Sequence, residues 1–313
     1  MSNSASKVVE QVIILFFVMI CGIFARKTNI IDRNSTKSLT KLLVSITQCF
    51  LMISSFQVEF SEELLNEGLW VMLLSFVIHV LLIVLCLFAF NMVKDTSKRK
   101  IYRFGTIFGN CGYLGFPVLN AIFGNIGVFY GAFLTFIFNI LAWTYGVIII
   151  RSDSQTKGFD KSQLKNIVNP VTISSFIGIL LFIFQIKIPS PLIDGIDMVG
   201  DMTFPLSMIV VGSLIADTNL RRILKNPYIY YLCFVKLIAF PIIAILLCKA
   251  AGLSRTLSYI AIVIAAVPPS TVTAAIPELY GQDSVLGAEI VGISTVISVA
   301  TIPFIIYLSD III

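Results

Sequence analysis

The sequence predicts an all-α integral membrane protein of ten transmembrane helices, arranged as two inverted repeats of five helices. Three observations lead to this fold class. Apolar residues make up 58% of the 313 residues and charged residues 12%, and the mean hydropathy is +0.97, far outside the range of a soluble domain. Ten apolar stretches have the length of a membrane-spanning helix. Their spacing repeats after 157 residues, the offset from Ser38 to Gly195.

The ten apolar stretches leave almost nothing for a soluble domain. A spanning helix needs about 20 mostly apolar residues. We expect the spans at Val8–Ala25, Ser38–Gln57, Leu69–Asn91, Ile101–Ile122, Val128–Ile150, Val168–Ile186, Leu192–Ala216, Tyr228–Ala250, Leu257–Leu279 and Ser284–Leu308. The two copies of the repeat are then residues 1–156 and 157–313, which together form one membrane domain.

The distribution of Lys and Arg predicts the orientation in the membrane. Most of the 22 basic residues fall in the connections after spans one, three, five and seven, at residues 26–41, 94–103, 151–165 and 221–225. The connection after span two holds Glu59, Glu62, Glu63 and Glu67 and no basic residue. Because basic connections stay in the cytoplasm, we expect a multi-pass protein of the cell membrane with both termini outside. This topology accounts for the net charge of +5, so the expected partner is the lipid bilayer and not nucleic acid.

A shift of 157 residues places the first five spans over the second five. Ser38–Gln57 then lies over Gly195–Leu214, and Val128–Ile150 over Val285–Tyr307. Because five is an odd number, the second copy enters the membrane from the opposite side, and the repeats are inverted. Inverted repeats are typical of secondary carriers. A channel would more often show a polar or charged stripe along its pore, and these spans show no such stripe.

Two spans at matching places in the repeats contain residues that interrupt a helix. Span four holds Gly109-Asn110-Cys111-Gly112-Tyr113-Leu114-Gly115-Phe116-Pro117, and span nine holds Ala266-Val267-Pro268-Pro269-Ser270-Thr271. Pro removes a backbone donor and Gly tolerates the angles that follow, so backbone groups are released at membrane depth. The amino ends of half-helices there suit an anion, whereas a single break would more often be a plain kink. We expect substrate contacts from Asn110, Gly112, Pro117, Pro268, Pro269, Ser270 and Thr271.

Polar and ionisable residues inside the spans are further candidates. His79 and Lys236 correspond under the 157-residue shift, near the middle of their spans, where a charge is costly and usually faces a partner or a cavity. They could supply positive charge or a proton route; alternatively, His79 hydrogen-bonds a carbonyl and Lys236 extends to the membrane surface. Asp201 and Glu289 are both available as carboxylate partners of Lys236. Asn139 contacts either the substrate or a neighbouring helix.

These motifs resemble the auxin efflux carrier family, which includes plant PIN-formed auxin exporters and bacterial permeases of malate, malonate and related acids. The resemblance rests on Gly109-Asn110 followed by Gly115–Gly124, and on Ala266-Val267-Pro268 leading to Glu278-Leu279-Tyr280-Gly281. It implies that spans four and nine cross at their breaks near Pro117 and Pro268 or Pro269, and that Asn110 binds the carboxylate. It also implies a scaffold of spans one, two, six and seven that carries a homodimer contact, and an elevator-like transport domain of the other six. Family members often have a Pro in span two, where this chain has Gln48.

The sequence favours a secondary transporter of small organic anions, mono- or dicarboxylates of the malate or auxin type, moved by elevator-type alternating access. A proton- or sodium-coupled carboxylate symporter is the alternative, and a channel is a weaker one. One His and no clustered carboxylates disfavour an intramembrane enzyme. The six cysteines form no CxxC pair, and no Walker-type loop precedes a helix, so we expect no metal, no cofactor and no use of ATP.

Overall fold

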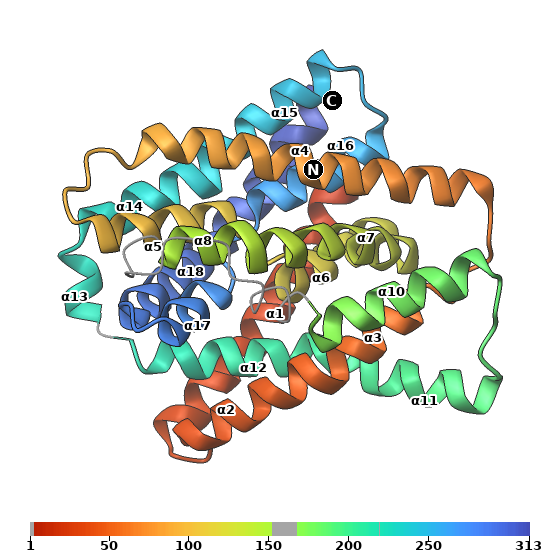
Figure 1. Cartoon of the computed structure of the whole chain (residues 1–313), viewed down its shortest axis with the longest axis horizontal. Helices are drawn as coiled ribbons and strands as arrows, with labels where there is room; N and C mark the ends of the chain where they lie inside the picture. The colour runs from red at the N-terminus through yellow and green to blue at the C-terminus, as the bar shows by residue number, and fades with distance from the viewer. Residues whose placement is uncertain (1–2, 152–167, 219) are drawn as a thin grey trace.

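The protein is built from helices that cross one another at several angles (Figure 1). A computed structural model describes residues 3–151, 168–218 and 220–313. In this part of the chain the only extended pairing is one antiparallel bridge between Gly109 and Pro269, so the described chain is all-helical, as predicted. The predicted repeat boundary at 156/157 and the basic residues from 157 to 165 lie outside the described residues.

Seven helices of the described chain are long and apolar enough to cross a membrane, and they coincide with seven of the predicted spans. Three are single α-helices: α1 (Asn3–Lys27), α4 (Glu62–Ala89) and α18 (Ser284–Ile312). The other four are built from consecutive helical segments, some of them π-helical turns labelled η. These are α2 (Arg33–Leu42), η1 (Leu43–Thr47) and α3 (Gln48–Ser55); α7 (Asn125–Leu141), η3 (Ala142–Gly146) and α8 (Val147–Arg151); α11 (Ser190–Asp201) and α12 (Thr203–Ala216); α14 (Pro227–Phe234), η5 (Val235–Ala239) and α15 (Phe240–Ala250).

The other three predicted spans contain shorter helices, and two of them are interrupted. One is α10 (Pro170–Ile183). Predicted span four is divided into α5 (Thr96–Ile107) and a second half made of η2 (Cys111–Gly115) and α6 (Phe116–Phe123). Predicted span nine is divided into α16 (Arg255–Ala266) and α17 (Val272–Leu279). Both predicted helix breaks are therefore present.

Polar side chains in the connections fix where several helices begin. Asp32 accepts the backbone N–H of Ser35 at 2.6 Å before α2, and Asp95 accepts that of Lys98 at 3.1 Å before α5. Capping of this kind satisfies one of the first N–H groups of a helix, which have no partner within the helix. Asp283 in the same way accepts the N–H of Leu286 at 2.9 Å and starts α18.

Helices of predicted spans one, two, six and seven form one packing group. Helix α1 lies along α12, and both α10 and α11 pack on α3. The contact of α1 with α12 depends on two glycines: a Cβ on Gly22 would lie 2.4 Å from the Ile209 carbonyl oxygen, and one on Gly212 would lie 2.1 Å from that of Met19. Small residues at such positions let two membrane helices approach closely.

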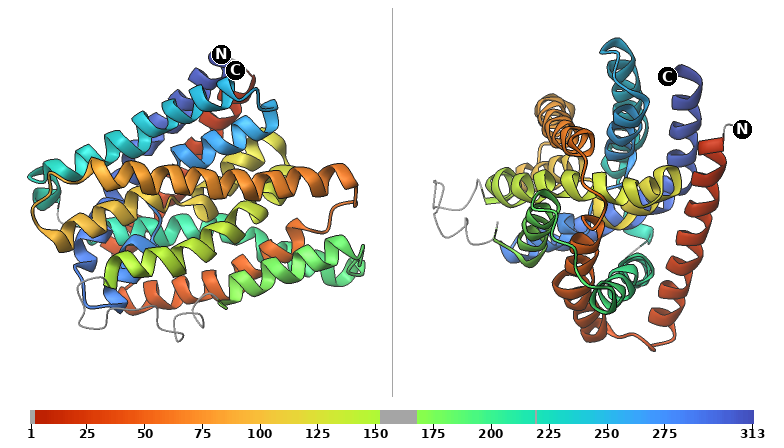
Figure 2. Two further views of the ribbon diagram at one scale, coloured as in Figure 1. Left: turned by 45° about the horizontal axis from the view of Figure 1, so that its top comes forward. Right: turned by 90° about the vertical axis from the view of Figure 1, so that its right-hand side faces the viewer.

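The remaining helices form a second packing group. In it α4 packs on α7 and on α16, and α17 packs on α18. The two groups touch where α1 meets α6 and α18, where α12 meets α18 and η2, and where α3 and α10 meet α7. The two chain termini lie close together at one end of the molecule (Figure 2). The second half of predicted span four therefore lies where the groups meet.

Large apolar side chains remain exposed over the outer helix faces. Phe17 of α1 is 68% exposed, Phe88 of α4 is 72% and Met198 of α11 is 74%. Apolar patches of this extent are rare on soluble monomers. Together with the seven long apolar helices, they indicate a multi-pass membrane protein.

Candidate functional site

The two helix breaks are hydrogen-bonded to each other. The backbone N–H of Asn110 donates to the Pro268 carbonyl oxygen at 2.6 Å, and the N–H of Ser270 donates to that of Phe108 at 2.9 Å. These bonds lie on either side of the bridge between Gly109 and Pro269. We call residues 108–110 and 267–271 the junction. Backbone polar groups released by each break are thus partly satisfied by the other, as a low-dielectric membrane interior requires.

Two half-helices begin at the junction. The turn η2 and helix α6 follow Asn110, and α17 follows Thr271, whose side chain makes no cap hydrogen bond. The first N–H groups of a helix carry partial positive charge because they have no partner within the helix. Both half-helices therefore present the positive end of their dipole to the junction, which favours a bound anion.

The oxygen of the Asn110 side-chain amide is hydrogen-bonded within the described part of the chain, whereas its nitrogen is not. Its Oδ1 accepts the backbone N–H of Tyr113 at 3.1 Å and so caps η2. The residue is only 2% exposed. Its Nδ2 is buried and has no hydrogen-bond partner among the described residues. Buried donors nearly always have a partner, so this –NH2 group is suited to a ligand oxygen.

Gln48 at the start of α3 is a residue that the sequence did not place in the site. A Cβ on Gly112 would lie 3.0 Å from Gln48 Nε2, so the glutamine amide faces the first turn after Asn110. Gln48 is 7% exposed and belongs to the other packing group. The sequence contained one indication, from the resemblance to auxin efflux carriers: a Pro is often expected in span two, where this chain has Gln48. Gly112 is therefore a further close contact between the two groups.

Lys236 lies directly beside the junction. Its side chain is fully buried, and Nζ donates to the Ile264 carbonyl oxygen in α16 at 3.4 Å. Nζ is also 3.1 Å from the position that a Cβ would take on Gly109. The alternative in which Lys236 extends to the membrane surface is therefore wrong. Its positive charge is instead adjacent to the released backbone of span four.

His79 lies on the other side of the same segment and is fixed by its neighbours. Its Nδ1 is 2.7 Å from the Ser75 carbonyl oxygen, and its ring centroid is 6.1 Å from that of Phe108 and 6.1 Å from that of Phe138. The expectation that His79 bonds a carbonyl is confirmed. His79 is 1% exposed and supports the aromatic residue next to Gly109.

The carboxylates that the sequence offered to Lys236 lie elsewhere. Asp201 is exposed at the end of α11, and Glu289 forms an ion pair with Arg222 at 3.3 Å. No ion pair in the described part of the chain joins Lys236 to a carboxylate. Arg222 belongs to the short helix α13 (Leu220–Leu224) between α12 and α14, and no regular spacing in the sequence predicts its contact with α18.

The remaining predicted residues divide into those at the junction and those outside it. Pro268, Pro269, Ser270 and Thr271 belong to the junction. Pro117 does not: the interruption is at 108–110, and Pro117 is buried inside the half-helix that starts at Cys111, directly after the π-helical turn η2. The expectation that the crossing is near Pro117 is therefore corrected. Asn139 Nδ2 is buried without a partner, and no hydrogen bond in the described chain joins it to the junction.

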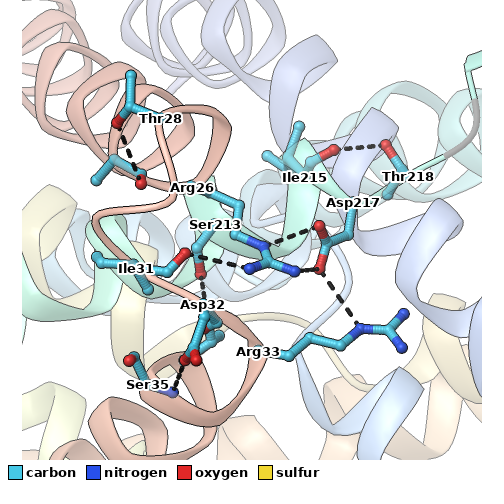
Figure 3. A network of polar contacts seen from close by, with 12 residues as sticks. Arg26, Thr28, Ile31, Asp32, Arg33, Ser35, Ser213, Ile215, Asp217 and Thr218 are labelled. Atoms are coloured by element: carbon cyan, nitrogen blue, oxygen red, sulfur yellow. Dashed lines mark hydrogen bonds and ion pairs between the residues drawn. The ribbon is translucent and has the colours of Figure 1, made fainter.

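A groove opens beside the connections after α1 and α12. Its volume is about 360 Å³, between α2 and α12 on one wall and α17 and α18 on the other; its lining includes Arg33, Lys37, Asp217, Ala274, Glu278 and Glu289. At its edge Arg26 bonds both oxygens of Asp217, at 2.9 and 3.0 Å, and Arg33 lies 3.8 Å from the same carboxylate (Figure 3). Ala274 is three residues, or about one helical turn, from Thr271 of the junction.

Two comparisons with known proteins agree with this geometry. A family model described as membrane transport protein matches residues 7–306. A curated relative, an uncharacterized transporter of Methanocaldococcus jannaschii, is 25% identical over 314 residues, which cover 94% of this chain and 96% of the relative.

Proposed function

We propose that this chain, which belongs to the membrane transport protein family, is a secondary carrier of small organic anions whose carboxylate binds at the junction. Membership of this family identifies the protein as a transporter and confirms the resemblance to auxin efflux carriers. The substrate class is inferred from the junction. Mono- and dicarboxylates of the malate or auxin type fit a site that offers hydrogen-bond donors and positive charge.

One observation carries the proposal: hydrogen-bond donors and positive charge converge at the junction, and not every donor there has an acceptor within the described part of the protein. Asn110 presents a buried –NH2 group without a partner, two half-helix amino ends point to the same place, and the Lys236 ammonium lies behind Gly109. Hydrogen bonds to a charged group are worth about 1.5 to 3 kcal/mol each when buried. A carboxylate would satisfy these groups, whereas an amine would be repelled by Lys236.

The helix order supports a ten-span arrangement of two inverted repeats, residues 1–156 and 157–313. The two interrupted spans are the fourth and the ninth, and their breaks pair antiparallel, as two half-helices entering from opposite sides would. The two packing groups correspond to a scaffold and a transport domain, whose relative sliding would expose the junction to each side in turn. We further propose that the scaffold forms a homodimer and that both termini are outside the cell membrane, which places the groove at the cytoplasmic side.

The proposal is tested by uptake of labelled malate, benzoate and indole-3-acetate into proteoliposomes that contain Asn110 variants. Asn110→Asp keeps the oxygen that caps η2 but puts a negative charge in place of the free –NH2 group. We expect it to fold and to lose affinity for every transported acid by more than about 30-fold, since one charged hydrogen bond is lost and a repulsion added. Asn110→Ala should lose about 10-fold.

Asn125→Ala provides the matched control, because Asn125 is exposed at the start of α7 and should transport as the unaltered protein does. If Asn110→Asp takes up the acids with the affinity of the unaltered protein, the carboxylate does not bind at the junction. Single-channel currents in the unaltered protein would show that it is a channel and refute the carrier hypothesis.

A further inference from the structure

A buried carboxylate outside the junction has no role in anion binding. Glu289 lies in the second turn of α18, within a membrane-spanning helix, and is 0% exposed. Neither of its oxygens has a hydrogen-bond partner in the described part of the chain, and its ion pair is with Arg222 Nε at 3.3 Å. Ionisable groups inside membrane spans are costly and usually functional, so this carboxylate requires an explanation.

Arg222 is shared between two carboxylates. Its NH2 group is 3.0 Å from Asp283 Oδ2, while its Nε is 3.3 Å from Glu289 Oε2. Asp283 also caps α18 through the N–H of Leu286. If Glu289 takes up a proton, Arg222, whose side chain is 45% exposed, keeps its ion pair with Asp283. The arrangement therefore tolerates both charge states of Glu289.

The other charged and titratable groups around Glu289 come from four elements. On the side of α5, the Tyr102 hydroxyl accepts a hydrogen bond from Asn226 Nδ2 at 2.8 Å and donates one to Asn226 Oδ1 at 3.1 Å. Glu278 of α17 lies on the same wall of the groove as Glu289, and Arg33 and Lys37 of α2 and Asp217 after α12 lie on the opposite wall. Asp217 is neutralised by Arg26 and Arg33 (Figure 3). Of these acidic groups, Glu289 is the fully buried one.

Glu289 and the half-helix that starts at the junction line the same groove. Both Glu289 and Ala274 line the groove, and Ala274 is one turn from Thr271. The first turns of α18 are pressed against α17: a Cβ on Gly287 would lie 2.2 Å from the Thr273 carbonyl oxygen. A change of charge at Glu289 therefore acts on the half-helix that starts at the junction.

We propose that Glu289 is the proton-binding site that couples the carrier to a proton gradient. Hydronium in the groove gives its proton to the Glu289 carboxylate, which becomes a neutral carboxylic acid and leaves water. The reverse transfer releases the proton on the other side after the transport domain has moved. The proposal rests on the proposed function, since the proton accompanies the organic anion and offsets one of its negative charges.

Two assays on Glu289→Gln proteoliposomes separate coupling from transport. We expect exchange of labelled for unlabelled malate to stay within about twofold of the unaltered protein, because exchange needs no net proton movement. Uptake driven by an imposed pH gradient should fall at least tenfold and lose its dependence on pH. Glu62→Gln, an exposed glutamate of α4, is the matched control and should keep both activities.

A second variant decides the matter if Glu289→Gln fails to fold. Arg222→Gln removes the positive charge that holds the proton off Glu289, so the pH midpoint of gradient-driven uptake should rise by about one unit or more. Gradient-driven uptake that is unchanged in Glu289→Gln, or a midpoint that is unchanged in Arg222→Gln, overturns the coupling proposal while the carrier assignment stands. If the unaltered protein exchanges none of malate, benzoate and indole-3-acetate, the proposed function fails, and coupling fails with it.

Discussion

Replacing Lys236 by methionine should have opposite effects on substrate binding and on folding stability. A carboxylate bonded to Asn110 would lie within roughly 7 Å of the ammonium, since Nζ is 3.1 Å from the Cβ position of the neighbouring Gly109. At that separation and an effective permittivity of about 20, the attraction is about 2.4 kcal/mol. Lys236→Met should therefore weaken carboxylate binding by about 50-fold, with little dependence on salt because the charge is buried.

The same substitution should raise the free energy of unfolding. The Lys236 ammonium is fully buried and makes one long hydrogen bond, to Ile264, so most of its desolvation cost is not recovered in the empty protein. Methionine has a similar length and no charge, and we expect it to stabilise the protein by about 1 to 3 kcal/mol. A purely structural lysine would instead be needed for stability.

Calorimetric titration with malate and thermal unfolding without it measure the two effects in detergent. Lys249→Met on the same span provides the control, because Lys249 is exposed and donates to the Ile312 carbonyl oxygen at 2.8 Å; it should bind malate normally. If Lys236→Met lowers the unfolding temperature in parallel with affinity, or leaves affinity within twofold, the reasoning about a buried attracting charge is refuted.

Three further substitutions test the pairing at the junction, the contact of Gln48 with it and the packing of α1 on α12. Gly109→Ala brings a Cβ to 2.9 Å from Val267 Cγ2, so it should separate the two breaks and reduce uptake more than tenfold; normal uptake would show that the pairing is dispensable. Gln48→Ala should lower carboxylate affinity by about 2- to 10-fold, the value of one neutral hydrogen bond, and an unchanged dissociation constant in calorimetry would exclude Gln48 from the site. Gly212→Ala should lower stability by about 1 to 3 kcal/mol because the helices it joins are overpacked, whereas Gly195→Ala, which meets nothing within 4 Å, should not; equal unfolding temperatures for the two would contradict the close approach.

The positions of the two breaks could be predicted because Gly and Pro act locally. Gly109 and Pro268-Pro269 change the backbone wherever they stand, and the structure interrupts helices at those residues. Pro117 shows the limit of the same reasoning. Pro117 lies inside a helical run that starts at Cys111 and continues through α6 after a π-helical turn. A helix can accommodate a proline by such a local change, so the sequence cannot show which proline interrupts its span.

Contacts between distant segments could not be predicted, for a physical reason. Gln48 reaches Gly112 only because two packing groups meet there, and Arg222 reaches Glu289 from a connection that has no fixed geometry in the sequence. The burial of Lys236 likewise depends on the pairing of the breaks around it. Local propensity and hydropathy carry no information on such distances, whereas the residue types, which are rare in membrane spans, did mark Lys236 and Glu289 as unusual.

The distance from a bound carboxylate to the Asn110 side chain tests the central claim most directly. Solid-state NMR can measure it through dipolar coupling between 13C-carboxyl malate and protein labelled with 15N in asparagine side chains, with Asn110→Asp identifying the Asn110 signal. We predict that Asn110 Nδ2 lies within about 4 Å of a malate carboxyl carbon, as a hydrogen bond requires. Malate that is bound but couples to no asparagine, or couples equally in Asn110→Asp, would contradict the assignment of the junction as the anion site.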